Sequence, residues 1–292
     1  MDPREAKFID VEGVRTRYFE KGTGDPLLLV HGGNVGSPHA ADCAFDWDLN
    51  FDGLARDFRV IAVDKVGQGF TDNPLRDADY TMHATVQHVA GFLKAMRLDG
   101  VHLVGHSRGG YLTCRLTLER PELVRSCTIV DSATLAPGQG RNHIVFRDWP
   151  QPPLTRDSQR WVLERYSYGP AVVTEPWLDE MMRVVARPEY AAAVAKMEEG
   201  GLDRTQFQPG LGRDRAETFR WICGRGLACP TLVVWGRNDP TATLDQGYAL
   251  LEMLTLRQKR TEFSVFNHSG HFTYREHPAA FNALVGGFCR ST

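Results

Sequence analysis

The strongest chemical signal in the sequence is the pentapeptide GHSRG at residues 105–109. It follows the apolar run VHLV directly and precedes a helical pattern that extends to Glu119. Small residues flank a serine where a strand turns tightly into a helix, and such a turn lifts the hydroxyl out of the sheet as an accessible nucleophile. The pattern therefore predicts Ser107 as the nucleophile of a hydrolase. A glycine-rich connection with an incidental serine is the weaker interpretation.

A serine nucleophile needs a general base, and the base needs an acid that orients it. His271 lies in the loop NHSGHF after the last apolar run, and His268 in the same loop is its rival. Asp239 follows the run TLVVWG, whereas Asp131 ends an earlier run and competes as the acid, although there it could simply cap a turn. We predict the triad Ser107, Asp239 and His271, because this chain order is the one expected for a nucleophile on such a turn.

The oxyanion of an attacked carbonyl needs backbone N–H donors. The loop HGGN at residues 31–34 follows an early apolar run, and its glycines would let the backbone approach a bound carbonyl. We predict the N–H groups of Gly33 and Arg108 as the oxyanion hole. Asn34, His106 and Phe272 are predicted to contact the substrate because they neighbour these groups in the sequence. The glycine-punctuated segment 64–71 is interpreted as scaffold.

Short apolar runs alternate with helical patterns along the chain, which predicts an α/β fold with a mostly parallel, eight-stranded sheet flanked by helices. Runs that are apolar throughout indicate strands covered on both faces. The predicted strands are Phe8–Val11, Arg15–Phe19, Pro26–Val30, Arg59–Val63, Val101–Val104, Val124–Val130, Thr231–Trp235 and Glu262–Phe266. The predicted core helices are Met82–Met96, Gly109–Glu119, Leu244–Leu254 and Pro278–Phe288.

About a hundred residues between Val130 and Thr231 contain no convincing strand but several helical patterns separated by prolines. A structureless loop of that length is improbable inside a compact domain. We therefore predict a helical cap over residues 135–225, inserted between core segments 1–134 and 226–292.

Composition excludes several classes of function. The 292 residues carry 34 basic and 36 acidic side chains, a net charge of −2, which leaves no basic excess for nucleic acid. No apolar run approaches the roughly 18 residues that cross a bilayer, and the N-terminus lacks the apolar stretch of a signal peptide. The six cysteines are scattered and predict reduced thiols rather than disulfides or a zinc site. We expect a cytoplasmic enzyme for a small molecule, without cofactor or metal, as a monomer or a homo-oligomer.

The sequence resembles the α/β-hydrolase superfamily over nearly its whole length. The segments LLLVHGG, VIAVDKVGQGFTDNP, VHLVGHSRGG, PTLVVWGRNDPTA and SGHFTYREHPAAFN occur in the order typical of that superfamily. Within it, the ending FNHSGHFTYREHPAAFN is similar to that of the meta-cleavage product hydrolases. This resemblance implies a cofactor-free serine hydrolase that cleaves a carbon–carbon bond in 2-hydroxy-6-oxo-dienoates formed during bacterial degradation of aromatic compounds.

Two departures from that family concern the substrate. The family commonly has asparagine before the nucleophile and a bulky apolar residue after it, where this chain has His106 and Arg108. The family's cap arginine, which binds the substrate carboxylate, falls near Met181 by alignment, so Arg183 is predicted to bind substrate in its place. A buried substrate carboxylate requires one cation besides the triad. Arg183 and Arg108 are equal candidates for that cation, and Arg187 ranks behind them.

Two alternative functions stay open on the sequence alone. The form GHSxG is also common in carboxylesterases and lactonases, so hydrolysis of small or aromatic acid esters is the main alternative. A ligand receptor that retains the triad without turnover is the third interpretation. Turnover of a simple aryl ester, lost when Ser107 is replaced by alanine, separates an enzyme from a receptor.

Overall fold

All residues 1–292 are described by the computed structural model, in which one sheet carries eight strands. The strand order is β1-β2-β4-β3-β5-β6-β7-β8. The first two strands pair antiparallel as a hairpin, and β3 to β8 run parallel to one another. The bounds are β1 Lys7–Val11, β2 Val14–Lys21, β3 Pro26–Val30, β4 Arg59–Val63, β5 Val101–His106, β6 Val124–Val130, β7 Thr231–Gly236 and β8 Thr261–Phe266. All eight predicted strands are present, and the α/β class is confirmed.

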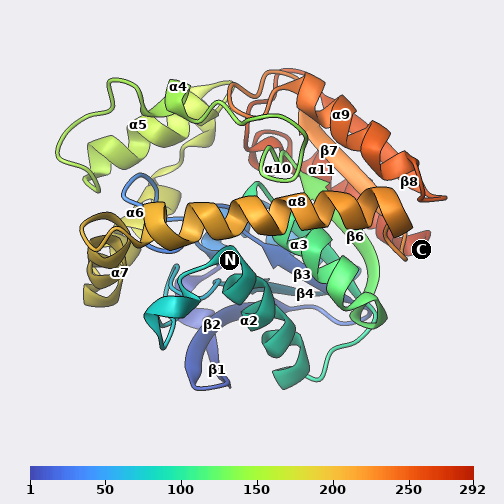
Figure 1. Ribbon diagram of the computed structural model, residues 1–292, viewed down its shortest axis with the longest axis horizontal. Helices are drawn as coiled ribbons and strands as arrows, with labels where there is room; N and C mark the ends of the chain where they lie inside the picture. Colours follow the sequence, from blue (N-terminus) through green and yellow to red (C-terminus); the bar gives the residue numbers. More distant parts are fainter.

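Helices cover both faces of this sheet (Figure 1). On β3, Leu28 and Val30 point into one apolar core, and Leu27 and Leu29 point into the other, as the two-residue period of a strand requires. The first core packs against α2, α3, α8 and α9, and the second packs against α1 and α11. These helices are α1 Asp48–Leu54, α2 Met82–Ala95, α3 Arg108–Glu119, α8 Gln208–Arg225, α9 Leu244–Thr255 and α11 Pro278–Arg290, and the short α10 is Thr273–Glu276.

The chain between β6 and β7 is helical throughout its ordered elements and contains no strand. Its last helix, α8, crosses the front of the molecule and contacts α2, α3 and α9, so this end of the predicted cap packs on the core (Figure 1). A π-helical turn, η6, precedes α8 directly. The cap elements before α8 are α4 His143–Phe146, α5 Arg156–Tyr166, α6 Glu175–Val185, α7 Pro188–Glu198 and η6 Asp203–Phe207.

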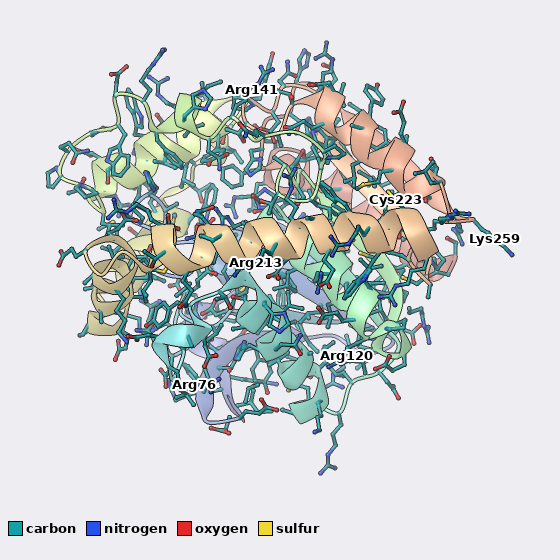
Figure 2. The ribbon with its side chains drawn as sticks, viewed as in Figure 1. Arg76, Arg120, Arg141, Arg213, Cys223 and Lys259 are labelled. Carbon is teal, nitrogen blue, oxygen red and sulfur yellow. The ribbon has the colours of Figure 1, made fainter.

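All six cysteines are unpaired, and Cys223, near the C-terminal end of α8, is the one that is exposed (Figure 2). None of the helices combines the length and the apolar character that crossing a membrane would require.

The cap helix α6 is fixed to the core by buried polar contacts. Arg17 on β2 donates from Nε to Asp64 at 2.5 Å and from Nη1 to Glu180 on α6 at 2.6 Å. All three side chains are almost completely buried. Trp177, one turn earlier on α6, donates its indole N–H to Asp46 at 2.8 Å. These contacts hold the inner side of α6 against the core.

We expect Glu180→Leu to lower the free energy of unfolding by about 1–3 kcal/mol, because Arg17 keeps its ion pair with Asp64 but its buried Nη1 donor loses its acceptor. Chemical denaturation monitored by fluorescence measures this loss. The matched control is Glu175→Leu, since Glu175 is exposed and bridges arginines at the surface, where ion pairs contribute about 0–1 kcal/mol. Equal losses in the two variants would contradict a structural role for the buried pair.

Candidate active site

Ser107 occupies the strained turn between β5 and α3. Its φ of 54° and ψ of −119° lie outside the regions that side-chain-bearing residues favour, as a nucleophile elbow requires. Close packing imposes glycine on both sides. A Cβ on Gly105 would lie 2.2 Å from the Gly109 carbonyl oxygen, and one on Gly109 would lie 2.4 Å from that of Val30. The Ser107 N–H donates to the Val130 carbonyl at 2.8 Å, which ties the turn to the end of β6.

The loops after β7 and β8 bring an acid and a base together. His271 Nδ1 lies 2.5 Å from Asp239 Oδ2, while Asp239 Oδ1 accepts the N–H groups of Thr241 at 2.8 Å and Ala242 at 2.9 Å. Burial lowers the pKa of His271, but the adjacent Asp239 charge and hydrogen bond outweigh burial and raise that pKa above its ordinary value. The pair therefore presents Nε2 of a well-oriented imidazole to the neighbouring cavity.

The alternative acid, Asp131, and the alternative base, His268, make other contacts. Asp131 accepts from the Gly236 N–H at 2.7 Å and from the Thr273 hydroxyl at 2.6 Å, and its contacts are with this turn rather than with the imidazole. Burial, followed by the charge of Asp239, raises the pKa of Asp131 well above its ordinary value. His268 is exposed and stacks on Tyr168 with ring centroids 5.2 Å apart. Neither side chain lines the cavity beside Ser107.

The glycine loop after β3 lies beside the nucleophile. Gly33 has a φ of +70°, a conformation that favours glycine, and a Cβ on Gly32 would lie 3.3 Å from that of Ser107. The N–H groups of Gly33 and Arg108 have no acceptor within the protein. Both residues line the same cavity as Ser107, so the two free donors are available to an oxygen bound there.

Lys65, in the turn after β4, fixes the orientation of this loop. Its Nζ donates to the carbonyl oxygens of Gly32 and Gly33, both at 2.8 Å. His31 lies 2.9 Å from the same Gly32 oxygen through Nδ1, and its Nε2 accepts the Lys65 N–H at 3.2 Å, so Nδ1 carries the proton. In a trans peptide the carbonyl and the following N–H point in opposite directions. Donors on the Gly32 carbonyl therefore turn the Gly33 N–H to the opposite side.

Two charged residues at this loop were not predicted from the sequence. Lys65 falls in the segment interpreted as scaffold, and burial lowers its pKa to about 7. The carboxyl of Asp42 packs directly against Gly33, since a Cβ on that glycine would lie 2.3 Å from Oδ2. Burial raises the pKa of Asp42, although the nearby Lys65 opposes that effect. A lysine directly after the apolar strand VIAV, in a glycine-punctuated turn, is the one signal in the sequence that could have indicated Lys65.

A cavity of about 220 Å³ opens above Ser107 between the sheet and the cap. One group of lining residues is aromatic: Tyr166 stacks on His271 at 4.9 Å between centroids and contacts Phe146 and Phe272 at 6.1 and 5.9 Å. The other group is polar and comes from the glycine loop, from the start of α3 and from the segment from α7 to α8. It comprises Asn34, Arg108, Glu198, Asp203 and Gln208. The cavity thus offers both aromatic and polar side chains to a bound molecule.

The predicted substrate contacts divide into two sets. Asn34, His106 and Phe272 line the cavity, and His106 also donates from Nε2 to the His271 carbonyl at 2.8 Å. Burial lowers the pKa of His106 well below its ordinary value, so this ring is neutral. Arg183 is not brought to the cavity: its side chain is 54% exposed and pairs with Glu180 at 2.6 Å. It projects from the outer side of α6, whose inner side is buried in the core.

Comparison with known proteins identifies the family. The model of the alpha/beta hydrolase fold matches residues 25–278, and the chain therefore belongs to the α/β-hydrolase fold family. It is 29% identical to a 2-hydroxymuconate semialdehyde hydrolase of Pseudomonas sp. strain CF600, over 98% of this chain and 94% of that protein. It is 30% identical to a 2-hydroxy-6-oxo-6-(2'-aminophenyl)hexa-2,4-dienoic acid hydrolase of Metapseudomonas resinovorans, over 97% of this chain and 91% of that protein.

A solved structure extends the similarity to three dimensions. The meta-cleavage product hydrolase of Pseudomonas fluorescens IP01 superimposes with a TM-score of 0.80 at 26% identity, covering 99% of both chains. The resemblance to meta-cleavage product hydrolases seen in the sequence is thereby confirmed.

Proposed function

We propose that the protein is a serine hydrolase in which Ser107 attacks a substrate carbonyl carbon. His271 accepts the hydroxyl proton at Nε2, and Asp239 orients the imidazole through Nδ1 and stabilises its charged form. The N–H groups of Gly33 and Arg108 bind the oxyanion. The observation that carries this proposal is the Asp239–His271 pair at 2.5 Å, which shares one cavity with a serine in the elbow conformation.

For the substrate we propose a 2-hydroxy-6-oxo-dienoate. Support comes from relatives with this type of name over nearly the whole chain and from the polar and aromatic sides of the cavity. The substrate first ketonises by moving the proton of its 2-hydroxyl group to C5. When the C5–C6 bond then breaks, its electron pair passes through the C3–C4 double bond to the C2 oxygen, which takes up a proton. Water releases the C6 acyl group from Ser107 as a carboxylic acid, so no cofactor takes part.

Parallel assays test this proposal. Purified protein is assayed with a ring-fission dienoate and, separately, with a panel of short aryl and alkyl esters. Hydrolysis of the dienoate is monitored by the loss of its visible absorbance. We expect the dienoate to be the best substrate by kcat/KM, with every activity abolished in Ser107→Ala. Faster turnover of neutral esters would favour the carboxylesterase or lactonase alternative. Binding without turnover of any compound would favour the receptor.

We expect Lys65→Met to lower kcat by up to about 10²–10³-fold with little change in KM, since the loss of one oxyanion donor sets the upper limit. The methionine fills a similar volume but leaves the Gly33 carbonyl without its donor and the Gly32 carbonyl without its shortest one, so the Gly33 N–H is held less firmly by the remaining contact of His31. Titration of active sites with an aryl fluorophosphonate corrects kcat for any unfolded fraction.

Lys21→Met serves as the control for Lys65→Met, because Lys21 is exposed and pairs only with Asp52. An unchanged kcat per titrated site in Lys65→Met would show that the loop keeps its orientation without the ammonium group.

A further inference from the structure

The side chain of Arg108 is a cation without a partner inside the cavity. It forms no ion pair and no side-chain hydrogen bond, and its Nη1 atom is shielded from solvent with no hydrogen-bond partner. The guanidinium group lies 5.1 Å from the ring centroid of Phe207, the last residue of the π-helical turn η6. Burying an unpaired charge is costly, and proteins retain such an arrangement where a ligand completes it.

Other arginines of the molecule are differently placed. Arg120 and Arg213 are exposed on the surface (Figure 2), and Arg183 and Arg187 pair with carboxylates outside the cavity. The inner side of α6 offers no room for a substrate-binding cation, because Met181 is buried in the second core. Arg108 is the one basic side chain that lines the cavity apart from the histidines.

The position of Arg108 links two functions within one residue. The same number of covalent bonds separates its backbone nitrogen from Nη1 as separates the C6 oxygen of a 2-hydroxy-6-oxo-dienoate from a C1 carboxylate oxygen. An extended substrate lying beside an extended arginine could therefore meet the backbone N–H with one end and the guanidinium with the other. A bidentate guanidinium–carboxylate contact is also strong and directional.

We propose that Arg108 is a specificity-determining residue that binds the substrate carboxylate with its side chain while its backbone N–H binds the oxyanion. It thereby selects substrates by the distance between the reacting carbonyl and the carboxylate. This inference rests on the proposed attack by Ser107, because the backbone role of Arg108 is defined only relative to that nucleophile.

Acidic residues near Arg108 offer a competing explanation for its positive charge in the cavity. Asp203 and Asp42 attract the guanidinium from beyond ion-pair distance, and Glu198 also lines the cavity. Burial, followed by the charge of Asp203, raises the pKa of Glu198, and burial raises that of Asp42, so neither carboxyl is strongly held in its charged form. Under the competing explanation, Arg108 balances these groups and makes no substrate contact.

The experiment uses benzoate esters of ω-hydroxy acids, in which the carboxylate belongs to the leaving group as in the dienoate. In 4-benzoyloxybutanoate the bond count between the two oxygens equals that of the dienoate, and the propanoate and pentanoate are one bond shorter and longer. Each acid is paired with its neutral carboxamide. We expect kcat/KM for the butanoate to exceed that of its carboxamide about 10- to 100-fold, mostly through KM, with smaller ratios for the other two lengths.

In Arg108→Met the ratio of acid to carboxamide kcat/KM should fall to about one at every length, because the acids lose more than the carboxamides do. Arg108→Lys should retain part of the preference, because it keeps the charge without the planar fork. Arg183→Met is the matched control and should leave the full preference in place.

Three outcomes overturn the proposal. Equal kcat/KM for acid and carboxamide in the unaltered protein, or an acid preference that survives Arg108→Met, removes the carboxylate contact. Equal losses on acids and carboxamides in Arg108→Met, per site titrated with fluorophosphonate, assign Arg108 to charge balance. Failure of the unaltered protein to turn over any ester or dienoate would instead contradict the proposed hydrolase function.

Discussion

Replacing His271 by alanine is expected to lower kcat on the order of 10⁶-fold, the magnitude that loss of the base produces in a comparable triad. His106 is a poor replacement, because burial lowers its pKa well below the ordinary value and its Nε2 already donates to the His271 carbonyl. The measurement is single-turnover and steady-state hydrolysis of an activated ester. His268→Ala should retain most of the activity, since that ring is exposed and stacks on Tyr168. Equal losses at the two histidines, with folding intact, would contradict the assignment.

The activity of the unaltered protein should depend on pH through the titration of His271. The base acts in its neutral form, and the pKa of His271 lies above the ordinary value for histidine. Activity should therefore rise with pH through an apparent pKa higher than about 6.5 in a profile of kcat/KM. Removing the Asp239 charge should move this limb to lower pH, because burial then acts on the imidazole without compensation.

Asp239→Asn is expected to lower kcat about 10⁴-fold while preserving the fold, because the amide favours the wrong imidazole tautomer. The asparagine oxygen can still accept the N–H groups of Thr241 and Ala242, so the loop keeps its shape. The comparison is kcat per titrated serine, with thermal unfolding as the check on folding.

Asp131→Asn is the matched control for Asp239→Asn, because the two carboxyl groups are similarly buried at the ends of neighbouring strands. The raised pKa of Asp131 favours its neutral form, which an amide resembles, and the Thr273 hydroxyl can reorient to accept from it. We expect activity within about tenfold of the original and a stability loss of about 1–3 kcal/mol. A larger loss of activity in Asp131→Asn than in Asp239→Asn would reverse the assignment of the acid.

The sheet was predictable because its central strands are apolar on both faces and helical patterns separate most of them. Runs such as LLLV and TLVV allow few alternatives in a chain of this composition. The short helix α1 was missed because Asp48–Leu54 contains one glycine and two acidic residues and is too short to show a helical period. Its packing against α11, far away in the sequence, stabilises it instead.

The site was predictable only where a motif fixes local backbone geometry. Ser107, Asp239 and His271 each follow a strand at the same edge of the sheet, and their order along the chain brings them together. Arg183 could not be placed correctly, because whether a helix presents its inner or outer side to a cavity depends on docking. The buried contact between Arg17 and Glu180, which are far apart in sequence, determines that docking.

The contact between the cap and the base has a consequence for access to the site. The His271 N–H donates to the carbonyl of Tyr166, the last residue of α5, at 2.8 Å, while the Tyr166 ring covers the imidazole. A Cβ on Gly270 would lie 2.4 Å from the same carbonyl oxygen, so the two segments touch along their backbones. Lifting the end of α5 to admit a substrate would also release the loop that carries His271. The position of α5 and the orientation of the catalytic base are therefore coupled through the Tyr166 carbonyl.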